Sequence, residues 1–220
     1  MRKFKLINIV ILILIIISLN ANAQKNDSLQ IIVNIQDSLL KKDINIIVPE
    51  LIFMYEYDQA IREYLSYATF NTSITDSIEN LPDTLQKKYR DKNQLPSELT
   101  KKIYADYISP YDKKHTKRLI EITKKYGFPS RQRIKKYYNK ELDEEFSPHI
   151  IFIHSAKEFW EELEILMTTE KEKGFYNKCQ YGHLLWHIHG RKNIQYMLDN
   201  GFKFITDEQG RKVLSGVDCK

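Results

Sequence analysis

The sequence predicts a mainly α-helical protein with one small β-hairpin near its C-terminus. Glycine is scarce, at seven of 220 residues, and most apolar residues recur every three or four positions, which is the spacing of an amphipathic helix. Near the C-terminus the pattern changes to alternation, because Phe202, Phe204 and Thr206 are separated by single residues. Alternation is typical of a strand. We therefore expect helices up to about residue 200 and two short strands after it.

Residues 1–23 are predicted to be an export signal that is removed from the mature protein. Three basic residues precede an almost unbroken apolar run over 6–19, and the small residues Ala21 and Ala23 are typical of a cleavage site. The apolar run is short for a helix that crosses a bilayer, and no second run follows. We expect a mature chain that begins at Gln24, is periplasmic or secreted, and has no permanent membrane span.

The mature chain, residues 24–220, has the length of one domain with a sizeable core. We divide it into an N-terminal helical segment over 24–48 and a helical domain over 49–220 that includes the hairpin. Without the signal, 31 basic residues face 29 acidic ones, a net charge of +2. A dedicated nucleic-acid binder carries a larger basic excess. We expect a monomer with no nucleic-acid partner, which binds a small molecule or an envelope component.

The two cysteines, Cys179 and Cys219, leave two alternatives open. An oxidising compartment favours a disulfide between them, which would tie the C-terminal tail to the body of the domain. Two thiols do not make a disulfide framework, so two unpaired cysteines fit the sequence as well.

Proline, glycine and capping residues indicate where the helices begin and end. Pro49 suits the first turn of a helix, Asp112 suits an N-cap, and Gly127 suits a C-terminus. The stretch over 71–95 is rich in Asn, Asp, Ser and Thr, which predicts a loop with at most a short helix around Leu85. The expected helices cover residues 27–42, 49–70, 97–108, 112–126, 148–174 and 178–189.

Two further segments complete the prediction. The run over 131–140 is basic and contains Tyr137 and Tyr138, and we interpret it as the solvated face of a helix rather than an anion-binding patch. Residues 207–210 suit a turn, and residues 212–214 are predicted to return as the second strand of the hairpin.

Asp58 and Arg62 are the first candidate site residues. They lie four positions apart in the predicted helix over 49–70, on one face with apolar neighbours. Opposite charges in such a place must be paired, because an unpaired charge in a dry site costs several kcal/mol. The pair is either a structural ion pair or a catalytic or ligand-binding group in which Arg62 holds an anion. A second apolar row predicts that this helix is buried on more than one side, and it comprises Phe53, Tyr57, Ile61 and Tyr64.

His154 is the second candidate catalytic residue. It lies in an apolar run at the start of the predicted helix over 148–174, on the same face as Glu158 four positions later. A histidine with this neighbour fits three roles, which are a metal ligand, a general base oriented by a carboxylate, and a hydrogen-bonded pair that only holds the helix in place.

His183 and His187 are candidate metal ligands. They lie four positions apart on one face of the predicted helix over 178–189, and two imidazoles at this spacing can chelate zinc. Leu184 stands where a zinc protease of the HExxH type has its glutamate, so that class is excluded. His154 and His189 are the other histidines that could converge on the same site, although a histidine is more often a plain polar residue of the core. No specific cofactor follows from the sequence.

The chain resembles a family of uncharacterised bacterial proteins known only as a domain of unknown function. The resemblance covers about residues 50–214 and rests on four motifs, which are Asp58-Gln59-x-x-Arg62, Asp112-x-x-His115, Tyr126-Gly127-Phe128-Pro129 and His154. It implies a shared mainly helical fold and one pocket that includes Asp58, Gln59, Arg62 and His154, with His115 and Tyr126 as further ligand-binding candidates. It implies no reaction. His115 and Phe128 depart from the family pattern, which has Asn and Trp there.

Two functions remain open from the sequence. One is a ligand-binding or interaction module of the cell envelope, with a polar pocket around Asp58, Arg62 and His154. The alternative is a hydrolase-like enzyme that uses His154 as its general base, with or without a metal held by the histidines.

Overall fold

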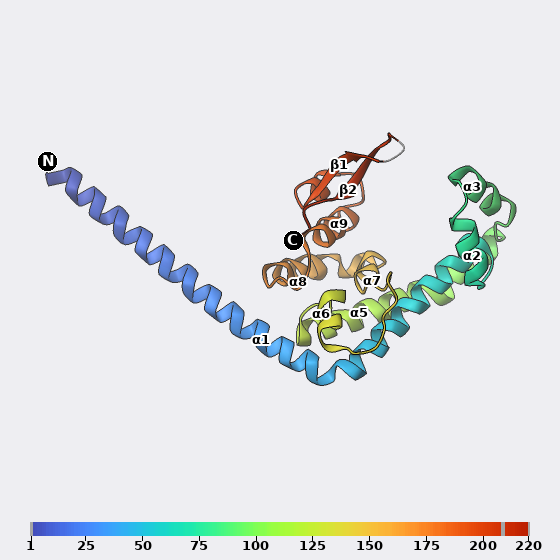
Figure 1. Cartoon of the computed structure of the whole chain (residues 1–220), viewed down its shortest axis with the longest axis horizontal. Helices are drawn as coiled ribbons and strands as arrows, with labels where there is room; N and C mark the ends of the chain where they lie inside the picture. Colours follow the sequence, from blue (N-terminus) through green and yellow to red (C-terminus); the bar gives the residue numbers. More distant parts are fainter. Residues whose placement is uncertain (1, 208–209, 220) are drawn as a thin grey trace.

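A computed structural model describes residues 2–207 and 210–219, with side chains from residue 27 onward. The predicted signal over 1–23 lies outside the described side chains. The structure is mainly α-helical and ends in one two-stranded antiparallel hairpin, as the sequence predicts (Figure 1). The first helices are α1 (Arg2–Tyr67), α2 (Thr72–Glu79), α3 (Asp83–Lys92), α4 (Ser97–Ile103), the π-helical turn η1 (Tyr104–Ile108), α5 (Ser109–Tyr126) and α6 (Arg131–Tyr137).

The second half of the chain contains shorter elements. They are α7 (His149–Ile153), the 3-10 turn η2 (Lys157–Phe159), α8 (Trp160–Glu172), α9 (Lys178–Ile188), α10 (Gln195–Leu198), β1 (Phe202–Thr206) and β2 (Lys212–Gly216). Across the part of the chain that the structure describes, no helix combines the length and apolar content needed to cross a membrane.

One helix, α1, takes the place of the two helices expected over 27–42 and 49–70, with Pro49 in its interior. Proline removes a backbone hydrogen bond and its ring clashes with the preceding turn, so inside a helix it produces a bend. Figure 1 shows α1 changing direction in its light-blue middle part. Leu40 and Leu51, on either side of Pro49, are both fully buried. The bent helix therefore contributes core residues before and after the proline.

Two other predicted boundaries are wrong. In the stretch over 71–95, α3 matches the short helix expected around Leu85, but α2 was not expected. Asn71 caps α2 by accepting a hydrogen bond from the backbone N–H of Ile74 at 3.3 Å. The expected break before Asp112 does not occur, because α4, η1 and α5 follow one another directly. Asp112 therefore lies inside α5 with its side chain available for other contacts, whereas Gly127 ends this helix as predicted, at a φ of 71°.

The hydrophobic core surrounds α5. Three of its residues, Leu119, Ile120 and Ile122, are at most 4% exposed. They belong to one cluster with residues of α1, α6, α7, α8 and α9. Because α5 contacts both α1 and α7, it fixes these two elements relative to each other.

The prediction that the basic run over 131–140 is a solvated face is correct for Lys135, Lys136 and Lys140, which are exposed, but not for Arg133. Its guanidinium is buried and donates to the carbonyl oxygens of Tyr126 and Phe128, both at 2.8 Å. It also contacts the carboxylate of Asp37 on α1 at 2.7 Å. Glu170 on α8 accepts a hydrogen bond from the backbone N–H of Phe128 at 2.6 Å. The turn after α5 is thus tied to α1, α6 and α8.

The C-terminal part is tied to α9 by a disulfide. Cys179, in the first turn of α9, is bonded to Cys219, which decides between the two alternatives that the sequence left open. The hairpin before Cys219 pairs Phe204 with Leu214 in antiparallel register. The backbone carbonyl of Gly201 accepts hydrogen bonds from the N–H groups of Val217 and Asp218, both at 3.0 Å. The tail is therefore held both covalently and through its backbone.

We expect the Cys179→Ser/Cys219→Ser double variant to have a free energy of unfolding about 2 to 4 kcal/mol below that of wild type, because the disulfide closes a loop of 40 residues. The variant should therefore unfold at a lower urea concentration. Urea melts followed by circular dichroism measure the difference. An unchanged melt for the variant, with wild type oxidised as shown by thiol titration, would contradict a stabilising role for this bond.

Candidate functional site

Asp58 is the centre of a polar network between α1, α5 and the end of α7. Both of its carboxylate oxygens lie 2.9 Å from Nδ1 of His154. The same carboxylate accepts hydrogen bonds from Nε of Arg62 at 3.0 Å and from Nε2 of Gln59 at 2.7 Å. Asp58 is 5% exposed. Four residues predicted from the sequence thus meet at one buried carboxylate.

Asp112 adds a second carboxylate to this network. Nη2 of Arg62 donates to Oδ1 of Asp112 at 2.6 Å, so the guanidinium lies between two aspartates. The ordered chain of contacts, Asp112–Arg62–Asp58–His154, is called the Asp58 network below. With His154 neutral and both carboxylates ionised, its net charge is −1. A negative net charge repels anions, and the guanidinium of Arg62 is already paired with two carboxylates. Both facts argue against the anion-binding role expected for Arg62.

The two aspartates have opposite pKa shifts. Burial acts to raise the pKa of Asp58, but the hydrogen bond and positive charge of His154, together with Arg62, outweigh it and the pKa lies below the ordinary value. For Asp112, burial dominates and raises the pKa, although Arg62 opposes this effect. Asp58 is therefore the carboxylate that the surrounding residues hold in its ionised form.

His154 reaches Asp58 because the helix expected over 148–174 is broken. Helix α7 ends at Ile153, His154 has φ −92° and ψ 7°, and Ala156 is extended. A residue in this bridge conformation no longer follows the helical spacing. The expected pairing of His154 with Glu158 does not occur, since Glu158 binds Lys113 at 2.9 Å. The break turns the imidazole toward α1 instead.

The Nε2 atom of His154 is the open end of the network. Among the described residues, no hydrogen bond to this atom is found, and 21% of the side chain is exposed. Because Nδ1 faces a carboxylate, it carries a proton, so Nε2 has a free lone pair in the neutral form of the ring. This arrangement can accept a proton or a hydrogen bond from a bound molecule.

His115 lies beside the network but does not join it by a hydrogen bond. It is 5% exposed and packs edge-on against the rings of Tyr57 and Tyr111, at 5.6 Å between centroids in both pairs. Burial lowers its pKa, opposed by the charge of Asp58. His115 is therefore a neutral member of an aromatic cluster behind Asp112.

Tyr126 lies apart from the network. Its hydroxyl donates to Oδ2 of Asp43 at 2.7 Å. Asp43 precedes Asp58 by fifteen residues on α1, which corresponds to roughly 20 Å along a helix. The expectation that Tyr126 lies near Asp58 is therefore not met, because Gly127 places this tyrosine at the far end of α5.

His183 and His187 face different partners. Nδ1 of His183 lies 3.2 Å from Nε2 of His149, and Nδ1 of His187 accepts hydrogen bonds from Arg191, the shorter at 2.6 Å. His189 contacts Glu164 at 3.1 Å. In the described part of the chain, no group of three or more metal-ligating side chains has the geometry to hold an ion.

Two residues of these polar clusters were missed at the sequence level. Asp112 was assigned to an N-cap, although its position three residues before His115 and its charge opposite to Arg62 were available signals. His149 lies at the start of the predicted helix over 148–174, and no motif in the sequence marks it as a site residue. It is buried, with 8% of its surface exposed, and its Nδ1 is hydrogen-bonded to the hydroxyl of Tyr176.

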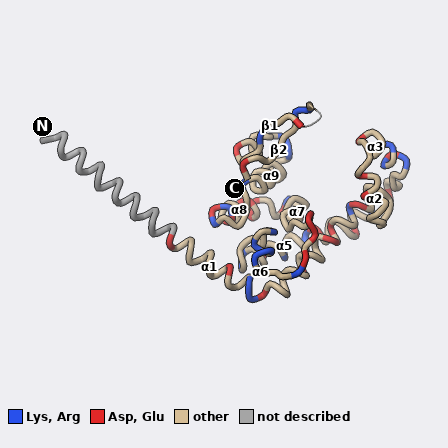
Figure 2. The backbone as a smooth tube through the Cα atoms, viewed as in Figure 1, with Lys and Arg blue, Asp and Glu red and all other residues tan. Residues whose placement is uncertain are grey.

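Two clefts lie near the candidate residues. A cleft of about 760 Å³ between α1, α2 and the loop before α7 is lined by Gln59 and by six carboxylates, which are Glu56, Glu63, Asp76, Glu79, Asp143 and Glu145. Figure 2 shows acidic residues following one another in that loop. Gln59 thus contacts both this cleft and Asp58.

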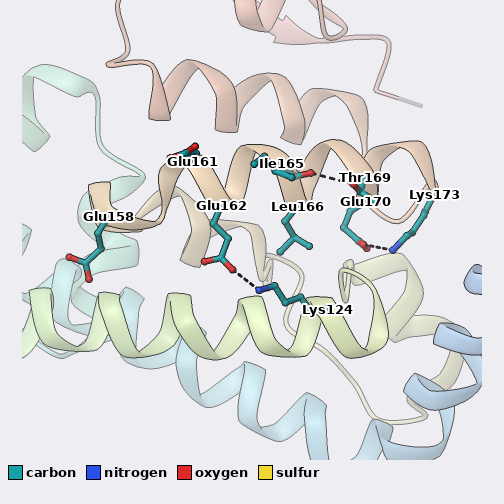
Figure 3. Close-up of a pocket in the computed structure, with 9 residues that line it drawn as sticks. All are labelled: Lys124, Glu158, Glu161, Glu162, Ile165, Leu166, Thr169, Glu170 and Lys173. Atoms are coloured by element: carbon teal, nitrogen blue, oxygen red, sulfur yellow. Dashed lines mark hydrogen bonds and ion pairs between the residues drawn. The ribbon is translucent and has the colours of Figure 1, made fainter.

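The other cleft, of about 600 Å³, lies between α5 and α8 (Figure 3). Ion pairs neutralise several of the charged residues that line this cleft, since Lys124 binds Glu162 at 2.6 Å and Lys173 binds Glu170 at 2.8 Å. No residue of the Asp58 network lines it.

Comparison of the chain with protein-family models, with curated proteins and with solved structures finds no match.

We expect Arg62→Ala to destabilise the protein by about 3 kcal/mol, at the lower end of the cost of breaking a buried ion pair, because His154 still faces Asp58. Arg118→Ala is a suitable control, since its ion pair with Glu50 is 41% and 34% exposed at the two side chains and should change stability by less than about 1 kcal/mol. Equal melts for the two variants would show that the network is effectively solvent-screened.

We also expect stability to fall as the pH drops from 6.5 to 4. Burial lowers the pKa of His149 to about 3 and that of His187 to about 4, so the unfolded chain binds these protons first and acid favours unfolding. His149 alone should cost about 2 kcal/mol at pH 5. Thermal melts across this range test the effect, and His149→Gln should flatten the profile. A wild-type melting temperature independent of pH would contradict it.

Proposed function

We propose that this chain is an exported, monomeric protein of the cell envelope that binds a polar small molecule at the Asp58 network. The observation that carries the proposal is the open Nε2 atom of His154, on a ring whose other nitrogen lies 2.9 Å from both oxygens of Asp58. A ring held in one orientation and one tautomer offers an acceptor of fixed direction. The ligand therefore presents a hydrogen-bond donor, such as a hydroxyl, amide or ammonium group.

The charge of the surroundings limits the ligand further. The Asp58 network carries a net negative charge when His154 is neutral, and the adjoining cleft contributes six carboxylates. Negative surroundings attract cations and repel anions, and they exert no net Coulomb force on a neutral molecule. The proposed ligand is accordingly neutral or positively charged, which departs from the anionic ligand expected from Arg62 alone.

The proposed export rests on the predicted signal over 1–23, and the Cys179–Cys219 disulfide supports it, since such bonds persist in oxidising compartments. The resemblance to a family of unknown function also remains a proposal. The meeting of Asp58, Gln59, Arg62, Asp112 and His154 in one network supports it, because these residues belong to three motifs that are far apart in the sequence.

A second candidate function is hydrolysis with His154 as the general base. The Asp58–His154 contact favours it, because a carboxylate at Nδ1 stabilises the imidazolium that forms when Nε2 takes a proton from water or a hydroxyl.

Both functions require that the Nε2 atom of His154 is accessible, and chemical modification tests this. Diethyl pyrocarbonate acylates accessible neutral imidazole, so we expect mass spectrometry to find His154 modified well before the buried His149. Asp58→Asn should change the rate at His154, because the amide replaces an ionised partner. A His154 that reacts no faster than His149 would show that Nε2 is not open and would end both proposals.

Native mass spectrometry and ester hydrolysis then separate the two functions. A co-purifying small molecule that is lost in His154→Gln, with no turnover, supports binding. Hydrolysis of p-nitrophenyl acetate that is lost in His154→Gln and kept in His189→Gln supports the enzyme. His189 is the matched control because it is partly exposed and bound to Glu164, away from Asp58.

A further inference from the structure

Helix α1 carries a second candidate site on another face. Tyr57, Ala60, Ile61 and Tyr64 follow the i, i+3, i+4, i+7 spacing of one helix face and line a cleft of about 430 Å³. Phe70, Ile103 and Tyr107 complete the lining, which is called the aromatic pocket below. Its volume falls within the usual range for small-molecule sites.

The aromatic pocket corrects a prediction from the sequence. The apolar row of Tyr57, Ile61 and Tyr64 was expected to be buried, yet none of these residues belongs to the buried core. Two of the other lining residues are largely exposed, Phe70 at 63% and Tyr107 at 51%. Apolar surface of this extent in contact with water, gathered in one cleft, is typical of a binding site.

The rings of the pocket are held in place by contacts with other residues. Tyr64 stacks on Phe70 with 4.3 Å between centroids, and Tyr57 stacks on Tyr111 with 4.4 Å. The hydroxyl of Tyr57 donates to the backbone carbonyl of Tyr107 at 3.1 Å. The pocket is therefore largely formed before a ligand arrives, which reduces the entropy lost on binding.

The π-helical turn η1 supplies Tyr107. An inserted residue of this kind rotates the following side chains relative to a regular helix, and such turns occur frequently at functional sites. This feature is independent of the pocket volume and of the exposure of its rings.

The charges around the pocket indicate its ligand. No charged side chain lines it. Behind its α1 wall, Asp58 and Asp112 share a single arginine. Lys114 lies 5.7 Å from the ring centre of Tyr111, which stacks on Tyr57 but does not line the pocket. Aromatic faces attract cations, and the carboxylates nearby repel anions.

We propose that the aromatic pocket binds an organic cation with an apolar substituent, of the quaternary ammonium class. This site lies on a different face of α1 from the Asp58 network and does not depend on the function proposed for His154.

Titration of the purified protein with benzyltrimethylammonium, followed by tyrosine fluorescence or by NMR, tests the proposal against two comparison probes. Benzyl alcohol is neutral and benzenesulfonate is anionic, and both contain the same ring. We expect the cation to bind at least about fivefold more tightly than benzyl alcohol, the ratio given by a contribution of about 1 kcal/mol from the cation–π contact, and benzenesulfonate to bind most weakly.

Tyr107→Ala and Tyr104→Ala locate the site, since both residues lie on η1 and are about half exposed, at 51% and 46%. Only Tyr107 lines the pocket, so only its loss should weaken binding. If Tyr107→Ala fails to fold, Phe70→Ala provides the same comparison. Absent binding, equal or tighter binding of benzyl alcohol or benzenesulfonate, or equal binding by the Tyr107 and Tyr104 variants would each overturn the proposal.

Discussion

The ionised carboxylate of Asp58 is the constraint on which the rest of the site depends. A charge that is 5% exposed must be compensated, and here three donors compensate it from two separate parts of the chain. Gln59 and Arg62 lie on the same helix as Asp58, so their hydrogen bonds to Asp58 do not position another element of the fold. His154 lies in the break after α7, and Arg62 also donates a hydrogen bond to Asp112 in α5. One buried charge therefore fixes three elements relative to each other, and it makes the break at His154 a required part of the fold.

The C-terminal part of α1 faces three different surroundings because a helix distributes neighbouring residues around its axis. Asp58 and Arg62 face the network, Tyr57, Ile61 and Tyr64 face the aromatic pocket, and Gln59 faces the acidic cleft. An amphipathic helix with a single apolar stripe would have buried that face in the core and exposed the other. This one has few residues in the core beyond Met54, and its other side chains are free to form sites.

The sequence predicted the parts of the structure that local rules determine. The Asp58–Arg62 pair follows from helical spacing, and the end of α5 follows from Gly127. The convergence of His154 on Asp58 did not follow from spacing and was implied only by the resemblance. The break after Ile153 has no glycine or proline to mark it, and tertiary contacts decide it. Asp112 shows a further limit, because an aspartate before an apolar run is equally suited to a cap and to a long-range ion pair.

The π-helical turn also determines how this chain can be related to others. An extra residue in a helix rotates everything after it by about 100° and advances it by about 1.5 Å. A relative with a regular α-helix between Ile103 and Asp112 would need one residue fewer to bring its aspartate to the same arginine. An insertion or deletion in this turn therefore changes which residues face α1, and not only the length of the chain. Each such change would shift Tyr107 or Asp112 relative to α1, and so would alter the aromatic pocket or the Asp58 network.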